Sequence, residues 1–238
     1  MSKIAISGNA SGTATYTIAS PAGSTDRVLT LPDEAGTVLT SAGTGNFPSN
    51  SVIQVVSTHF TDQLSYGTAD GSGNATSISS GFSVVPSQTY VNITAKKANS
   101  KFLVLFNGNI TSTNDGNYGD WTGGIGLLVD PSGGTSWAQI ANGVNSGNTN
   151  NSVFFHTRSD AAATGSDSLH STNVSMNYLY TSSVSAGTTL RFAAEYFHYD
   201  SASHQTLLIN RTGENAANNN VYHQGGMATT ITVMEIAG

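Results

Sequence analysis

Cysteine is absent from this chain, and charged residues are scarce. None of the 238 residues is Cys, and only 9% are Asp, Glu, Lys or Arg, far below the rough quarter that is usual in globular domains. The missing cysteines exclude disulfide bonds and thiolate zinc sites. The 8 Lys plus Arg and the net charge of −6 provide no basic stripe for a phosphate backbone, so we expect no nucleic-acid partner.

Long apolar runs are missing as well. No uninterrupted apolar stretch approaches the roughly 20 residues that a membrane-spanning helix needs. The opening "MSKIAISGNASG" has no apolar run long enough for a signal peptide. We therefore expect that the protein does not insert into a membrane and that it is made in a cytoplasm.

The chain contains many Gly, Ser, Thr and Asn residues, together with β-branched and aromatic ones. Disordered chains normally combine high net charge with few aromatic or β-branched residues, which is not the composition found here. The sequence therefore predicts a folded, all-β protein whose polar surface is mostly uncharged.

Residues 1–50 form the first of two segments that differ in pattern. They hold the short alternating fragments "KIAIS", "ATYTIAS", "RVLTL" and "TVLTS", which turn signals separate, and end in the linker "SAGTGNFPSN". A segment shorter than roughly 60 residues with so little apolar mass is marginal as an isolated domain. We expect an extended β arm or stem that completes its strand pairing on sister subunits or on a larger assembly.

Residues 51–238 form the second segment, which we expect to be an antiparallel β-sandwich. No part of it shows a sustained helical stripe, and Gly, Asn and Ser separate many short alternating runs. The expected strands lie within residues 52–60, 90–95, 100–111, 123–130, 152–158, 173–181, 189–199, 206–211 and 228–238. The expected core side chains are Phe102, Val104, Phe192, Tyr196, Ile231 and Val233, with the terminal strand inside a sheet.

Two very polar stretches interrupt this segment and are expected to be surface loops. They are "NDGNYGDWTGG" with "GVNSGNTNNS", and "RTGENAANNNVYHQGG". Their ring side chains lie beside amide groups, a combination that holds sugars by flat stacking and hydrogen bonds. These candidates for glycan binding are Tyr118, Trp121, Tyr222 and His223. A plug over the end of the sandwich is the alternative role for such loop aromatics.

No catalytic or metal-binding pattern emerges from the sequence. In "EYFHYDSASHQ" strand alternation directs Glu195 and His198 to opposite faces. A retaining glycosidase needs two carboxyl groups roughly 5 Å apart, and the candidate acids are scattered: Asp115, Asp120, Glu195 and Glu214. The "GGIG" of residues 123–126 lacks the Lys-Ser/Thr of a phosphate loop and fits a tight turn. We expect no enzyme, no cofactor and no metal.

The stretch "SGTATYTIASPAGSTDRVLTLPDEAGTVLTSAG" resembles a module near the N-terminus of many bacteriophage fibre and virion-surface proteins. The "LTLPDxxGTVLT" pattern carries the resemblance, and residues 27–40 supply it here. The resemblance implies that residues 1–50 attach to other virion proteins or intertwine as a stem. Its candidate anchoring residues are Tyr16, Ile18, Val28, Leu29, Leu31, Val38 and Leu39.

Three later stretches resemble the trimeric jelly-roll domains, similar to C1q and tumour necrosis factor, that phages place at the ends of fibres. They are "YVNITAKKANSKFLVLFNGNI", "MNYLYTSSVSAGTTLRFAAEYF" and "ATTITVMEIAG". The resemblance implies a homotrimer with the last strand near the threefold axis. The long insertion between Trp137 and Asn173 departs from the compact versions of this fold and leaves the strand order open.

Together the resemblances imply a structural protein of a phage virion, made in the host cytoplasm. One role is a trimeric fibre or spike that contributes to host attachment by binding a cell-surface glycan. A decoration or cement protein on the phage head fits the same architecture. A carbohydrate-active enzyme is the third alternative, and it would need a buried carboxylate pair.

Overall fold

The computed structural model of the chain describes residues 11–13, 15, 17, 22–24, 28, 47–67, 82–114, 121–140, 155–159, 171–198, 205–210 and 227–238. The chain divides into two units, Met1–Val38 and Leu39–Gly238. Within the first unit, Val28 is 93% exposed, and the other expected anchoring residues lie outside the described ones.

The second unit is built from strands. Its described residues contain one short 3-10 helix at Ser87–Thr89 and the following strands: β1 Val52–Phe60, β2 Leu64–Gly67, β3 Phe82–Val84, β4 Val91–Thr94, β5 Lys101–Asn114, β6 Trp121–Asp130, β7 Ala138–Gln139, β8 Phe155–Ser159, β9 Ser171–Thr181, β10 Thr189–His198, β11 Gln205–Ile209 and β12 Thr229–Ile236. The expected all-β class is confirmed.

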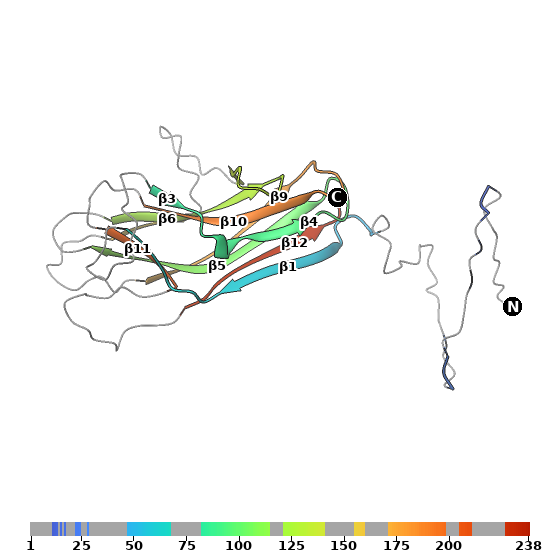
Figure 1. The fold of residues 1–238 in the computed structure, drawn as a ribbon, viewed down its shortest axis with the longest axis horizontal. Coiled ribbons are helices and arrows are strands. Elements are labelled where there is room, and N and C mark those ends of the chain that lie inside the picture. The colour runs from blue at the N-terminus through green and yellow to red at the C-terminus, as the bar shows by residue number, and fades with distance from the viewer. Residues whose placement is uncertain are drawn as a thin grey trace. The chain divides into compact units, whose positions relative to one another are not determined.

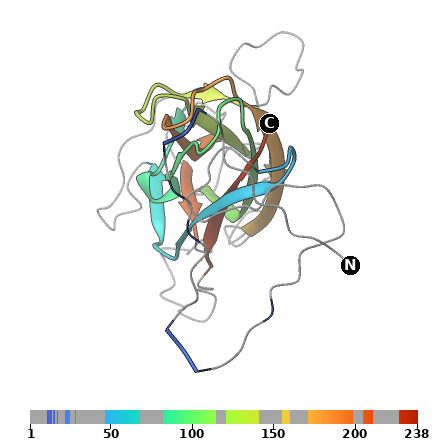
Figure 2. The same ribbon diagram turned by 90° about the vertical axis from the view of Figure 1, so that its right-hand side faces the viewer.

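Two antiparallel sheets form a sandwich. In the first sheet β12 lies between β1 and β5, β9 pairs with β5, and β11 joins β5 to β2. In the second sheet β10 lies between β6 and the short strands β3 and β4, while β7 and β8 pair with β6. Figure 1 shows β1, β12 and β5 running side by side, and Figure 2 views the same strands after a 90° turn.

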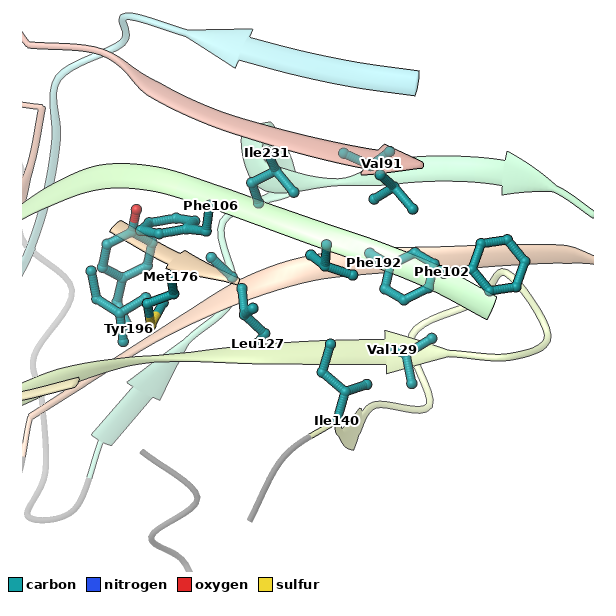
Figure 3. Packing of buried hydrophobic residues seen from close by; sticks show 14 of the residues in the cluster. Val91, Phe102, Phe106, Leu127, Val129, Ile140, Met176, Phe192, Tyr196 and Ile231 are labelled. Carbon is teal, nitrogen blue, oxygen red and sulfur yellow. The ribbon is translucent and has the colours of Figure 1, made fainter. Parts of the chain in front are cut away.

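The core lies between the sheets and contains every core residue that the sequence predicted. Strand alternation directs every second side chain inward, and Phe102, Phe106, Phe192 and Tyr196 are fully buried. The ring centroids of Phe102 and Phe192 lie 5.7 Å apart, and those of Phe106 and Tyr196 lie 6.4 Å apart. Figure 3 shows these rings packing from both sheets.

The terminal strand is fixed inside the first sheet by a buried carboxylate. The Glu235 side chain on β12 is fully buried. Its Oε1 accepts hydrogen bonds from the Ser100 hydroxyl at 2.7 Å and the backbone N–H groups of Lys96 at 2.9 Å and Lys97 at 3.1 Å. Its Oε2 accepts from Gln54 Nε2 at 2.5 Å. A buried charge with this many donors joins β1, β12 and the turn before β5.

A second buried polar residue, Asn210, connects β1, β5 and β12 at the opposite end of the first sheet. Asn210, which follows β11, has a positive φ of 59°. Its side-chain amide donates to the carbonyls of Phe60 and Asp62, and its Oδ1 accepts from the Thr229 hydroxyl at 2.8 Å. Its backbone N–H donates to Asn109 Oδ1 at 2.7 Å. Asn is among the residues that tolerate the left-handed conformation. Asn210 can therefore adopt this backbone conformation while its side chain forms hydrogen bonds with its buried neighbours.

Two expectations about residues 121–126 are wrong. The sequence predicted a loop that includes Trp121 and a tight turn at Gly123–Gly126, but all these residues belong to β6, which confirms the strand expected at residues 123–130. Gly123 and Gly124 pair with β8 on one side and β10 on the other. Glycine has a weak intrinsic preference for strands, but its backbone N–H and C=O can still pair, and neighbours on both sides here outweigh that preference.

Candidate functional site

An apolar row crosses the outer face of the first sheet. Val55 on β1 stands opposite Met234 on β12, Met234 opposite Leu103 on β5, and Leu103 opposite Leu179 on β9. Their strand neighbours Val104 and Val233 point into the core, so these four side chains point away from it. We call Val55, Met234, Leu103 and Leu179 the apolar row.

The apolar row is uncovered within this subunit. Val55 is 54% exposed and Leu179 is 46% exposed, while Leu103 and Met234 are partly exposed. The row contains no charged side chain. Val52, at the start of β1, is also 52% exposed.

Further along the strands the same face becomes polar. Thr232 stands opposite Ser57, and their hydroxyl oxygens lie 2.9 Å apart. One position beyond on this face, His59 Nδ1 lies 3.0 Å from the Thr230 hydroxyl. On the other side of the apolar row, Lys101 stands opposite Thr181 on the same face, so the row lies between two polar parts of the face.

The centre of a protein interface is usually more apolar and less charged than the rest of the protein surface. Large exposed apolar patches mark interaction sites, and interface cores are depleted of charged residues. Of the described large apolar side chains, the exposed ones are Val28, Val52, Val55 and Leu179, and all but Val28 lie on this sheet. The arrangement can bury apolar surface against a partner.

A second surface, on the other sheet, gathers two aromatic rings and a cation. The ring centroids of Tyr90 and Trp137 lie 5.3 Å apart with the rings tilted by 59°. The guanidinium carbon of Arg191 lies 5.0 Å from the centre of the Tyr90 ring, within the range of a cation–π contact. All three side chains are partly exposed. We call them the Tyr90–Trp137–Arg191 cluster.

Two hydrogen bonds fix the Arg191 side chain in this cluster. Its Nε donates to Asn92 Oδ1 at 2.7 Å, and its Nη1 donates to the backbone carbonyl of Gly134 at 2.8 Å. Arg191 points outward because its neighbour Phe192 on β10 fills the core. Asn92 stands opposite it on β4, so strand register brings the two side chains together.

The turn that leads to Trp137 is held by Asp130. The Oδ1 of Asp130 accepts hydrogen bonds from the Ser132 backbone N–H at 2.7 Å and from the Ser132 hydroxyl at 2.6 Å. Its Oδ2 accepts from the Ser136 backbone N–H at 2.6 Å. These bonds, above all the one from the Ser132 hydroxyl, hold the pKa of the Asp130 carboxyl below its usual value. The Asp130 carboxylate therefore fixes the turn as far as Ser136, directly before Trp137.

Polar side chains continue this surface beyond the rings. Gln139 Nε2 donates to Glu195 Oε2 at 3.3 Å, and both side chains are partly exposed. Asn92 is exposed. Hydrogen-bonding groups therefore lie on the same sheet as the aromatic cluster.

The predicted glycan candidates lie largely outside the described residues. Tyr118, Tyr222 and His223 are not among them, and Trp121 is described only as the first residue of β6, opposite Ser159. The Tyr90–Trp137–Arg191 cluster was not predicted. Its members are far apart in the sequence, and only the pairing of β10 with β4 and β6 brings them together.

Two further observations concern metal and membrane. Among the residues that the structure describes, no three His, Asp or Glu side chains gather in a way that could hold a metal ion. No helix in the same part of the chain is long and apolar enough to cross a membrane.

Comparison with known proteins gives no family. No family model matches the chain, and no curated protein does. A solved structure of the infectious bursal disease virus Gx strain is 12% identical, with a TM-score of 0.30, over 85% of this chain and 46% of that one. A structure of the T13 particle of the same virus is 11% identical, with a TM-score of 0.28, over 85% and 43%. The chain spans less than half the length of these proteins, and similarity this low assigns neither fold nor function.

Proposed function

We propose that this protein is a non-enzymatic structural protein of a bacteriophage virion. It assembles as a homotrimer that is displayed as a fibre or spike and contributes to attachment to the host surface. The observation that carries the proposal is the apolar row on the outer face of the first sheet, which one subunit leaves uncovered.

A second copy of the chain is the occupant that we assign to the apolar row. The row contains no charge, so burying it carries no penalty for desolvating an ion. Homo-oligomers are the commonest soluble assemblies, and a heterologous contact around a threefold axis gives each row the same neighbour. Closed rings with different numbers of subunits could cover the row in this way. We choose the trimer because the later stretches of the sequence resemble trimeric jelly rolls.

The order of the main strands supports the jelly-roll resemblance. The first sheet contains β1, β12, β5 and β9 in that order, and the second contains β4, β10, β6 and β8. Counted along the chain as eight strands, this is the order 1-8-3-6 against 2-7-4-5, which a jelly roll has. The insertion between Trp137 and Asn173 contributes β7 and β8, which both pair with β6, and β8 is the fifth of these eight strands.

Residues 1–50 attach the protein to other virion proteins in this proposal. The support is the "LTLPDEAGTVLT" sequence and its resemblance to the phage module. The exposed Val28 is an apolar side chain of that segment that a partner can cover. A decoration role on the phage head uses the same attachment and differs in the location on the particle.

Two measurements test the proposal. Sedimentation equilibrium of the full-length protein at micromolar concentration should give about three times the chain mass of 24.5 kDa. A monomeric mass contradicts the homotrimer and with it the assembled fibre. Immunogold labelling of intact particles then separates the roles, because label at the tail supports a fibre or spike and label over the head supports decoration.

A further inference from the structure

We propose that the Tyr90–Trp137–Arg191 cluster is a saccharide-binding surface. The inference deepens the proposed function, because it names the ligand class and the residues through which a displayed head would attach to a host surface. It differs from the loop site predicted around Trp121, since it lies on the outer face of the second sheet.

The ring geometry suits a sugar. Pyranose rings present apolar C–H faces, which pack on aromatic side chains, while their hydroxyl groups need hydrogen bonds. Trp137 and Tyr90 both keep part of their surface exposed, and their 59° tilt makes a corner rather than a flat stack. A corner of two rings can contact one face and one edge of a sugar.

The cluster is held in place before any ligand arrives. Asp130 ties the turn at Ser132 and Ser136, directly before Trp137. Arg191 ties the same turn at Gly134 and covers Tyr90. A surface whose side chains are already ordered loses little conformational entropy on binding, which favours affinity for a small ligand.

Donors remain for the sugar oxygens. Within the part of the chain that the structure describes, the hydrogen bonds of Arg191 use Nε and Nη1, which leaves Nη2 to donate to a ligand hydroxyl or carboxylate. Asn92 accepts from Arg191 through Oδ1, and no hydrogen bond among the described residues uses its amide nitrogen, which can serve as a second donor. Two donors beside two rings provide the mixed polar and aromatic contact that sugars require.

The two tryptophans of the chain, Trp121 and Trp137, allow a direct test. Their indole N–H signals in the NMR spectrum of the full-length protein are assigned with the variants Trp121→Phe and Trp137→Phe. The probes are galactose, N-acetylglucosamine and glucuronic acid, each titrated to tens of millimolar. We expect at least one probe to shift the Trp137 signal in a saturable way while the Trp121 signal stays in place.

Variants then connect the shift to the cluster. Trp137→Ala should weaken binding of that probe by about tenfold or more, whereas Trp121→Phe should leave it unchanged. The inference is overturned if no probe moves the Trp137 signal, if only the Trp121 signal moves, or if Trp137→Ala binds as the unaltered protein does. Should Trp137→Ala fail to fold, the titration of the unaltered protein decides alone.

The mass of the same sample separates this inference from the proposed function. A trimer that binds no sugar overturns the saccharide site and leaves the homotrimer intact. A monomer that binds sugar through Trp137 retains the saccharide site and contradicts the proposed assembly.

Discussion

Leu103 of β5 stands opposite Leu179 of β9, and both side chains lie on the outer face of the first sheet, where Leu179 is 46% exposed and Leu103 is partly exposed. Leucine is among the residues most often buried in a folded domain. Their outward direction follows from the inward direction of Val104 and Phe102, which the core requires. The first prediction concerns this pair.

Placing a charge in the apolar row should dissociate the assembly. In Leu179→Glu a carboxylate would have to be buried in the subunit interface, and an unpaired buried charge is strongly unfavourable. We expect a shift from trimer to monomer in light scattering, with the β-sheet signal in circular dichroism retained. The control is Ala186→Glu, which adds the same charge at an exposed turn. A trimer that survives Leu179→Glu would place the interface elsewhere.

Truncating a central ring should destabilise the sandwich. Phe192 is 0% exposed and contacts Phe102 and Tyr180. Phe192→Ala removes a large buried ring and should lower the free energy of unfolding by about 3–5 kcal/mol. The measurement is denaturant unfolding at a fixed protein concentration, because association adds to apparent stability. Val28→Ala, at a site 93% exposed, should change it by less than about 0.5 kcal/mol.

Long alternating runs made most of the fold predictable. The run of residues 189–199 alternates large apolar side chains with others, and β10 occupies 189–198 with Leu190, Phe192 and Tyr196 buried. Every one of the nine expected strand segments overlaps an observed strand. Period-two patterns of this length predict both the strand and its buried face.

The strands that the sequence did not indicate are short. β2, β3 and β7 contain 4, 3 and 2 residues, too few for an alternation to be recognised. Their pairing with β11, β10 and β6 comes from neighbouring strands rather than from local preference. For residues 123–126 the sequence indicated both a strand and a tight turn, and the pairing with β8 and β10 confirms the strand in spite of the glycines.

The aromatic cluster could not be predicted because its geometry is non-local. Trp137 follows a turn, Tyr90 precedes β4, and Arg191 is on β10. Nothing in the local sequence of any one of them indicates the other two. Their proximity depends on the register of β10 with β4 and β6, which only the folded structure provides.

Removing the charge of Glu235 should loosen the end of the first sheet. Glu235→Gln puts an NH2 group where an oxygen now accepts hydrogen bonds from Ser100, Lys96, Lys97 or Gln54. At least one buried donor then loses its acceptor, which costs about 1–3 kcal/mol. We expect a lower free energy of unfolding and faster hydrogen exchange at the amides of Lys96 and Lys97. The matched control is Glu195→Gln, at a partly exposed carboxylate, whose effect should be within about 0.5 kcal/mol. Equal effects at the two sites would contradict the role assigned to Glu235.

Acid should release the turn before Trp137. The hydrogen bonds from Ser132 and Ser136 hold the pKa of Asp130 below its usual value, so this carboxylate stabilises the folded state fully above the ordinary carboxyl pKa of about 3.9. That stabilisation is lost as the pH falls from there through the lower pKa of the folded state. In Ser132→Ala the largest cause of the lowered pKa is removed, and the Asp130 carbon signal should titrate at a higher pH in an NMR experiment. The control Ser183→Ala, at an exposed position, should leave the titration in place. A pKa of Asp130 that does not rise in Ser132→Ala would mean that the Ser132 hydroxyl does not hold the carboxylate, and the ordering of Trp137 would then need another source.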